Sequence, residues 1–140
     1  MGAGRKWLIL AGALMVGIQL VPTGRSNPPE PAPLVAGQPV LEVFQRACFD
    51  CHSNRTAWPW YSRVAPVSWL VVGHVKEGRE HLNFSEWENL TADRRAKLAG
   101  DAYGEVAAGK MPLQGYTLLH GEARLTGADL NLIKAWSRSR

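Results

Sequence analysis

Apolar residues follow two patterns along this chain: one unbroken run near the N-terminus, then helical spacing through most of the rest. The run covers residues 7–21, WLILAGALMVGIQLV, in which Gln19 is the only strongly polar side chain. Arg5 and Lys6 precede it, and a short basic segment before an apolar run is typical of an export signal. The sequence therefore predicts a signal peptide or signal anchor over residues 1–21.

The apolar run can be either cleaved or retained. It is at the short end for a bilayer span, which needs about 20 residues, and no small-x-small cleavage site precedes Pro22. Because positive charge stays on the cytoplasmic side, we expect an uncleaved anchor with Arg5 and Lys6 inside the cell. Cleavage is the alternative. The run contains no cysteine, which excludes a bacterial lipoprotein.

A proline-rich segment follows over residues 22–39 and holds six of the nine prolines. Proline-rich chain is stiff and extended at about 3.1 Å per residue, so a linker of this length would hold a domain roughly 40–50 Å from the membrane. The alternative is a segment that wraps the domain, because such chain also docks on aromatic surfaces. We expect a spacer here.

Residues 40–140 have the length of one small domain. A first helix, with residues 48–52 at its C-terminal end, is predicted by four apolar positions at helical spacing, namely Val40, Val43, Phe44 and Ala47. Pro66 suits the first turn of a second helix. The inward face that we expect for this second helix consists of Val67, Leu70, Val71, His74, Val75 and Leu82.

The C-terminal half continues the helical pattern. Ser85 to Glu88 has the spacing of a capping box, and residues 92–108 predict a third helical region that stops at Gly109. Thr126 precedes a final helix with Leu130, Ile133 and Trp136 on one stripe. No useful strand-like alternation occurs, so the sequence predicts an all-α domain.

The net charge of +4 comes largely from the N-terminal region. Residues 30–140 carry 13 basic and 12 acidic side chains, whereas a nucleic-acid-binding surface needs basic residues gathered on one face. No nucleic-acid partner is expected. Arg94, Arg95 and Lys97 form a short basic run that we interpret as solvated surface, with a docking patch for an acidic redox partner as the alternative.

The chemistry of the chain is indicated by Cys48-Phe49-Asp50-Cys51-His52, which has the C-x-x-C-H spacing of covalent c-type haem attachment. Each thiol can form a thioether to a vinyl group of the porphyrin, and the histidine then lies under the iron as its proximal ligand. The prediction is one haem c per chain, bound by Cys48, Cys51 and His52.

Three other readings of the motif are a zinc half-site, a thioredoxin-like redox pair and a chance disulfide. A structural zinc site needs four ligands, and the chain has no third cysteine. A thioredoxin-like pair would follow a strand in a βαβ unit, whereas the residues before Cys48 predict a helix. Haem attachment is the reading that fits best.

An aromatic segment follows the motif: Trp58, Trp60, Tyr61 and Trp69 fall within twelve residues of one another. Together with Arg63 they could line the haem edge and donate hydrogen bonds to its propionates, with plain core packing as the alternative. We also expect the carbonyl of Pro59 or Pro66 to accept a hydrogen bond from Nδ1 of His52. Such a bond orients a metal-bound imidazole.

The order of these parts resembles the class I cytochrome c fold, in which an N-terminal helix runs into the haem motif and a C-terminal helix crosses it. Phe44 and Trp136 resemble the aromatic pair at that crossing. Met111, on the loop before the last helix, resembles the methionine that ligates the iron in this class. His74 is the rival as sixth ligand, while His81 and His120 are expected to be solvent-facing or structural.

The chain also resembles the small bacterial haem-binding-domain family of membrane-anchored c-type cytochromes over nearly its whole length. The segments that carry this resemblance are GRSNPP (24–29), CFDCHSN (48–54), WPWYS (58–62), APVSWLV (65–71), EGREHLNFSEW (77–87) and KMPLQGYTLLH (110–120). The resemblance implies a monohaem protein at the bacterial inner membrane, with its haem domain in the periplasm.

We therefore expect an electron carrier rather than an enzyme, with His52 and Met111 on the iron and redox proteins in or at the membrane as partners. The alternative is a haem-based gas sensor or peroxidase-like enzyme with a labile or open sixth site. His74 and Arg79 are the only candidates for its acid–base residues. A subunit that mainly recognises a partner complex would have the same sequence pattern.

Overall fold

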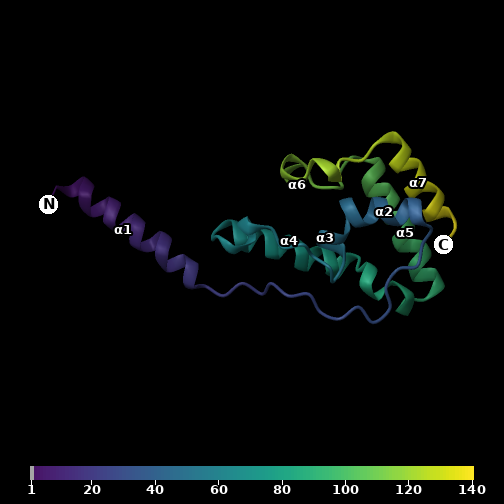
Figure 1. Cartoon of the computed structure of the whole chain (residues 1–140), viewed down its shortest axis with the longest axis horizontal. Helices are drawn as coiled ribbons and strands as arrows, with labels where there is room; N and C mark the ends of the chain where they lie inside the picture. Colours follow the sequence, from purple (N-terminus) through teal and green to yellow (C-terminus); the bar gives the residue numbers. More distant parts are fainter. Residues whose placement is uncertain (1) are drawn as a thin grey trace.

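The computed structural model describes residues 2–140, which form helices and no strands (Figure 1). The all-α prediction is confirmed. The elements are α1 (Ala3–Gly17), the 3₁₀ helix η1 (Ile18–Leu20), α2 (Gln38–Ala47), α3 (Phe49–His52), η2 (Trp60–Arg63), α4 (Val67–His81), η3 (Phe84–Asn89), α5 (Ala92–Ala107), α6 (Gln114–Leu119), η4 (Gly121–Ala123) and α7 (Gly127–Arg138).

The N-terminal helix stands apart from the other helices, which gather at the opposite end of the molecule (Figure 1). The stretch Ala3–Leu20 is long and apolar enough to cross a membrane, and none of it is buried inside the protein. Apolar side chains left in water are costly, so this helix is suited to a lipid environment. It has the features of a membrane anchor or a signal sequence.

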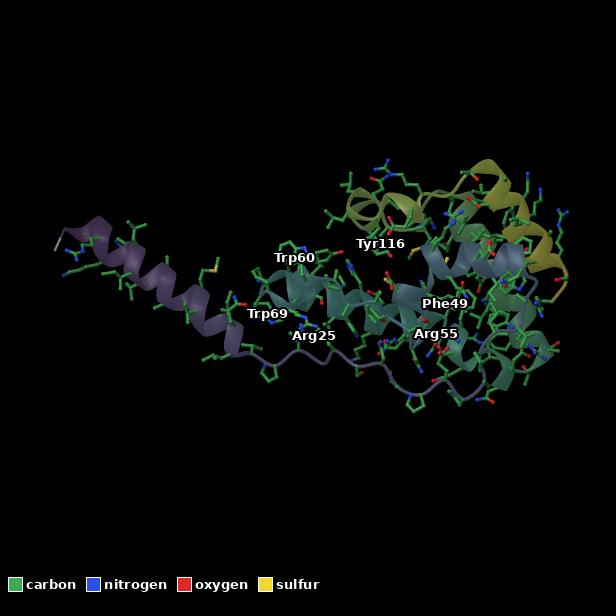
Figure 2. The ribbon with its side chains drawn as sticks, viewed as in Figure 1. Arg25, Phe49, Arg55, Trp60, Trp69 and Tyr116 are labelled. Carbon is green, nitrogen blue, oxygen red and sulfur yellow. The ribbon has the colours of Figure 1, made fainter. Side chains whose placement is uncertain are left out.

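The proline-rich segment runs along the surface of the domain instead of standing away from it (Figure 2). Its contacts are spread over its length: Arg25 Nη1 donates to Ser62 O at 3.0 Å, Asn54 Nδ2 to Pro29 O at 2.7 Å, and Leu34 N to Phe84 O at 2.8 Å, while Arg55 pairs with Glu30. Leu34 is buried in the core. The spacer geometry predicted for residues 22–39 is therefore wrong, because the domain satisfies the backbone of this segment.

Helix α2 forms where predicted, with its four apolar positions buried. Pro39 lies in its first turn, where its missing N–H is harmless. The helix ends at Cys48, whose extended φ of −126° separates it from the short α3. The C-x-x-C-H motif thus follows the first helix of the domain, as the spacing predicts.

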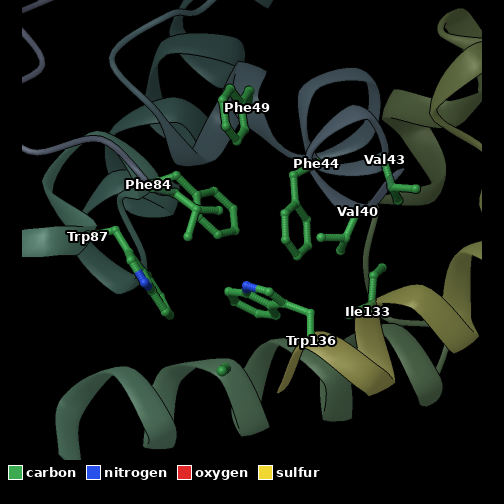
Figure 3. Packing of buried hydrophobic residues seen from close by; sticks show 10 residues of the cluster. Val40, Val43, Phe44, Phe49, Phe84, Trp87, Ile133 and Trp136 are labelled. Atoms are coloured by element: carbon green, nitrogen blue, oxygen red, sulfur yellow. The ribbon is translucent and has the colours of Figure 1, made fainter. Parts of the chain in front are cut away.

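The two ends of the domain meet where α2 crosses α7. Phe44 and Trp136 pack there edge to face, with ring centroids 4.7 Å apart, so the predicted aromatic pair is confirmed. Figure 3 shows that Phe84, Phe49 and Trp87 extend this contact into a cluster of rings. Aromatic pairs of this kind add about 0.5–1.5 kcal/mol each beyond the burial of their area.

Helix α7 begins after Thr126, as predicted, and its N-terminus has a full capping box. The Thr126 side chain accepts from the Asp129 N–H, and the Asp129 carboxylate accepts from the Thr126 N–H at 2.8 Å. Arg46 of α2 also pairs with Asp129 at 2.6 Å. Burial by itself would raise the pKa of Asp129, but its hydrogen bonds to Arg46 and Thr126 hold that pKa below its usual range.

The predictions for the middle of the chain need two corrections. In α4, Val67 and Leu70 are exposed, whereas Ser68, Val75 and Gly78 are buried, so the buried stripe of α4 differs from the predicted inward face. The capping box expected from Ser85 does not form: Asn83 caps η3, and the Ser85 hydroxyl instead donates to Glu30 at 2.9 Å.

The third predicted helix is α5, which Thr91 caps at its N-terminus through a side-chain bond to the Arg94 N–H. It ends at Ala107, and Gly109 follows with φ +68°. Glycine adopts this left-handed conformation without the steric cost of a side chain. The predicted stop at Gly109 is confirmed.

The ion pair between Arg46 and Asp129 predicts a pH-dependent difference in stability. Asp129→Asn should lower the free energy of unfolding by about 1.5–3 kcal/mol at pH 7, the range for hydrogen bonds to charged groups. Because the folded-state pKa of Asp129 is depressed, its contribution is fully present above the unfolded pKa of about 3.9. It is lost as the pH falls through the folded value.

Urea unfolding of both proteins at pH 7 and at pH 3 measures this difference. Glu42→Gln removes an exposed carboxylate from the same helix as Arg46 and should leave stability unchanged at either pH. A difference between wild type and Asp129→Asn that is as large at pH 3 as at pH 7 would contradict the assignment.

Candidate functional site

A cavity of about 850 Å³ lies between α3, α4, α5 and the start of α6. This volume is within the range of small-molecule and cofactor sites. Its apolar walls include Phe44, Phe84 and Ile133 from the core, so the aromatic cluster also forms part of the cavity lining. Cys48, Cys51, His52 and Met111, which were predicted as site residues, all line this same cavity.

Helix α3 positions the two thiols and the imidazole. The His52 N–H donates to the Cys48 carbonyl at 2.8 Å, and the Cys48 N–H donates to the Phe44 carbonyl at 2.8 Å. These bonds hold the motif as one helical turn directly after α2. Residues three and four apart lie on one face of a helix, which brings the side chains of Cys48, Cys51 and His52 to the same cavity.

Neither cysteine is part of a disulfide. Burial first, then the negative charge of a neighbour, raises the pKa of Cys48 to about 12 and that of Cys51 to about 11. Redox-active C-x-x-C pairs depend on a lowered thiol pKa. The environment of these thiols therefore disfavours the thioredoxin-like reading.

The zinc reading is disfavoured as well. Within residues 2–140 no group of three or more His, Cys, Asp or Glu side chains is arranged to hold a metal ion. The thiols and imidazole of the motif therefore lack the further protein ligands that a structural zinc site requires.

The imidazole of His52 is oriented by a backbone carbonyl. Its Nδ1–H donates to Leu82 O at 3.0 Å, which fixes the tautomer and leaves Nε2 with a free lone pair. Burial lowers the pKa of His52 although this hydrogen bond opposes the shift, so the ring is neutral at pH 7. The prediction that Pro59 or Pro66 supplies this carbonyl is wrong, because it comes from Leu82 at the C-terminal end of α4.

Helix α4 approaches α3 most closely at Gly78. A Cβ atom at this position would lie 2.6 Å from the Cys51 carbonyl oxygen and 3.2 Å from the Cys51 Cβ. Only glycine allows this approach without moving the backbone. The close approach at Gly78 therefore allows the C-terminal end of α4 to bring the Leu82 carbonyl within hydrogen-bond distance of His52.

Met111 lies on the cavity wall between α5 and α6, on the irregular loop where the sequence predicts it. His74 of α4 lines the same cavity, so both predicted candidates for a second iron ligand face it. His81 also borders the cavity, but its side chain is 78% exposed and lies 3.9 Å from Glu77.

His120 lies outside the cavity lining and has a structural role, as expected. It stacks on Tyr116 with ring centroids 4.3 Å apart and shares a hydrogen bond of 2.7 Å with the Tyr61 hydroxyl. These contacts tie the end of α6 to η2.

The aromatic segment does not line the cavity. Trp58, Trp60, Tyr61, Trp69 and Arg63 are absent from its walls, and Figure 2 shows Trp60 and Trp69 at the end of the domain nearest α1. The prediction that they flank a haem edge is therefore wrong. Trp69 lies at the start of α4, whereas α4 packs against α3 near its other end, at Gly78.

Two cationic side chains of the basic run are exposed, as expected for solvated surface, and also line the cavity. They are Arg94 and Lys97 of α5, and Lys97 also pairs with Asp101 at 2.5 Å. Arg95, the third member of the run, pairs with Glu88 at the same distance and is not part of the wall. The α5 side of the cavity thus carries two cations and two carboxylates, because Asp101 and Glu105 line it as well.

A hydrogen bond closes α6 over the motif. The Tyr116 hydroxyl donates to Asp50 Oδ2 at 2.6 Å, and Asp50 lies between the two cysteines in the sequence. Burial and then the hydrogen bond with this carboxylate raise the pKa of Tyr116, which keeps the phenol protonated as a donor. The bond holds the helix after the Met111 loop to the helix that carries His52.

Arg79 joins the proline-rich segment to the loop that follows the motif. Its guanidinium donates to Ser53 O at 2.8 Å, Ser26 O at 3.0 Å, Asn27 Oδ1 at 3.1 Å and Thr56 Oγ1 at 2.9 Å. It is not among the cavity-lining residues. Arg79 is therefore unsuited to the distal acid–base role that the enzyme alternative requires.

Sequence reasoning missed four residues that build the site: Gly78, Leu82, Asp50 and Tyr116. Gly78 could have been suspected, because a glycine inside a helix commonly marks a close approach. The roles of the other three depend on contacts between residues far apart in the chain. No spacing or composition signal reports such contacts.

A protein-family model described as a haem-binding domain matches residues 13–139 of the chain. No curated protein and no solved structure shows significant similarity to it. The match includes the motif, the Met111 loop, all of α2 to α7 and the C-terminal part of α1.

The contact at Gly78 predicts that an added methyl group separates α4 from α3. Gly78→Ala should lower the free energy of unfolding by about 1–3 kcal/mol, the range for overpacked sites, and reduce the haem content of the purified protein. The matched control is Gly73→Ala in the same helix, where a Cβ meets no atom within 4 Å. Urea unfolding and haem absorbance measure both effects, and equal behaviour of the two variants would contradict the close approach.

The bond between Tyr116 and Asp50 predicts a second stability difference. Tyr116→Phe should cost about 1.5–3 kcal/mol of unfolding free energy, because the half-buried carboxylate of Asp50 loses a donor. Tyr103→Phe is the control, since the Tyr103 hydroxyl makes no hydrogen bond to residues 2–140. Thermal unfolding of the two variants provides the comparison, and an equally small effect for both would mean that Tyr116 does not hold α6 in place.

Proposed function

The chain belongs to the haem-binding-domain family, and on this basis we propose that it is a monohaem c-type cytochrome that carries single electrons outside the cytoplasm. The observation that supports this best is the shared cavity. The C-x-x-C-H motif and Met111 line one cavity of the size of a cofactor site, although Met111 lies 59 residues after His52 in the sequence.

The residues around the cavity fit a covalently attached haem. Cys48 and Cys51 present their thiols to it from one helical turn, as two thioether bonds require. His52 presents Nε2, because Nδ1 is held by the Leu82 carbonyl. Phe44, Phe84 and the other apolar wall residues provide the surface against which a porphyrin ring packs.

Met111 would complete the coordination as sixth ligand. Bound there, haem supplies an iron that gains and loses one electron, and methionine ligation raises its potential. The Met111 loop is held in place by α5 on one side and by the bond from Tyr116 to Asp50 on the other. A ligand held by rigid neighbours moves little between oxidation states, which suits electron transfer rather than substrate binding.

Arg94 and Lys97 would face the carboxylates of the cofactor. Both lie on the cavity wall, and guanidinium and ammonium groups are the usual partners of buried or half-buried carboxylates. This assignment replaces the one first made for the aromatic segment and Arg63.

The N-terminal helix supplies the location in this proposal. Covalent haem attachment and an apolar α1 with Arg5 and Lys6 in its first turn fit a bacterial inner-membrane protein whose domain lies in the periplasm. Its partners would be redox proteins in or at the membrane. A gas sensor or peroxidase-like enzyme is less well supported, because Arg79 is occupied by four hydrogen bonds away from the cavity.

The ligand assignment is tested by absorption spectra of the reduced protein with and without carbon monoxide. The wild type should be low-spin and inert to carbon monoxide, since both axial positions are filled. Met111→Ala should become high-spin and bind carbon monoxide, because one coordination position opens. His74→Ala, which alters the other candidate on the cavity wall, should behave like the wild type.

Two outcomes would overturn parts of the proposal. A reduced wild type that binds carbon monoxide readily would favour the open-site alternative over the electron carrier. Loss of the low-spin spectrum in His74→Ala but not in Met111→Ala would transfer the sixth ligand to His74.

A further inference from the structure

Exposed apolar side chains gather at one end of the domain. Apart from residues 7–21, the large hydrophobic side chains that are exposed within residues 2–140 lie at this end. Val35 is the one exception. The turn η2 and the start of α4 contribute Trp60, Val64, Val67, Trp69 and Leu70, and Trp60 is 76% exposed. A contiguous apolar surface of this kind on a water-soluble domain marks an interaction site.

Helix α6 adds two more residues to this end. Leu118 and Leu119 are exposed at its C-terminus, and the next residue, His120, is hydrogen-bonded to Tyr61 of η2. The ends of α6 and α4 therefore lie on the same side of the domain (Figure 1). We call this surface the apolar end.

The apolar end is fixed to the end of the N-terminal helix. Gln19 makes a pair of hydrogen bonds with the backbone of Ala65: the Ala65 N–H donates to Oε1 at 2.9 Å, and Nε2 donates to the Ala65 carbonyl at 3.1 Å. Figure 2 shows Trp60, Trp69 and Arg25 beside this junction. A helix that crosses a bilayer thus ends where the apolar end begins.

Positive charge accompanies the apolar residues. Arg25 and Arg63 line a hollow of about 280 Å³ at the junction, together with Gln19 and Thr23. Tryptophan is enriched at both membrane–water interfaces, and guanidinium groups form strong hydrogen bonds with phosphate oxygens. The apolar end combines both kinds of residue.

We propose that the apolar end lies in the headgroup layer of the bilayer that α1 crosses. Trp60, Trp69 and Leu119 then lie at the boundary between headgroups and acyl chains, and Arg25 and Arg63 lie at the phosphates. This inference rests on the retained anchor of the proposed function. Its consequence is that the domain is seated on the membrane in one orientation, with the cofactor cavity held close to the lipid surface. A lipid occupant fits better than a protein, because the surface is continuous with the one helix that is suited to lipid.

Photo-crosslinking in native membranes tests the proposal on the full-length haem protein. The variants Trp60→p-benzoylphenylalanine and Leu119→p-benzoylphenylalanine place a reactive ketone on the apolar end, and neither residue lines the cavity. Val35→p-benzoylphenylalanine is the matched control, since Val35 is 71% exposed at a distant site. After irradiation, mass spectrometry of the purified chain detects phospholipid adducts.

Adducts from positions 60 and 119, with none from position 35, are the expected result. Gln19→Ala combined with the change at position 60 should reduce the adducts while the protein stays in the membrane fraction, because the junction with Ala65 is lost. Crosslinks to a protein without phospholipid would overturn the lipid assignment, and so would equal adducts from all three positions.

Failure of the anchor is distinguishable from failure of this surface. A chain recovered in the soluble fraction would overturn the membrane proposal, while its haem absorbance and response to carbon monoxide would still report on the cytochrome assignment. A chain retained in the membrane without adducts at either position would overturn only the seated orientation.

Discussion

The short helix α3 has to present two thiols and one imidazole nitrogen to the same cavity, and much of the fold serves that requirement. On one side α2 continues directly into it, and the Cys48 N–H bonds to the last turn of that helix. On the other side α4 packs against its backbone at Gly78 and places the Leu82 carbonyl on His52. The motif is held from both directions, so its side chains have little freedom to turn away.

The core and the cavity are parts of one structure. Phe44 packs on Trp136 where the first and last helices of the domain cross, and it also borders the cavity with Phe84 and Ile133. A domain of this size buries a limited apolar area by itself. A porphyrin packed on these rings would extend the hydrophobic core, so cofactor binding and folding stability are expected to be coupled.

The sequence was most informative where the deciding contacts are local. Helical spacing located α2, Thr126 marked the start of α7, and the C-x-x-C-H motif identified three neighbours that do meet at one cavity. The pair Phe44 and Trp136 was predictable only through a family resemblance. It joins residues at opposite ends of the domain.

The errors arose where the partner of a residue lies far away in the chain. Pro59 and Pro66 were close to His52 in sequence, but the carbonyl that reaches it belongs to Leu82. The tryptophans near the motif lie at the other end of α4, and Arg94 and Lys97 from a distant helix take the places on the cavity wall. Composition indicated that residues 22–39 are extended, yet it did not reveal that the domain holds them.

That extended segment changes where the folded unit begins. Leu34 fills a place in the core, Glu30 meets Arg55 and Ser85, and Arg79 spends its guanidinium on Ser26 and Asn27. A polypeptide trimmed to residue 40 would expose the surfaces that these residues cover and remove two hydrogen-bond acceptors from the half-buried Arg79. The folded unit therefore includes the proline-rich segment from about Arg25 onward, and this segment is structurally part of the domain.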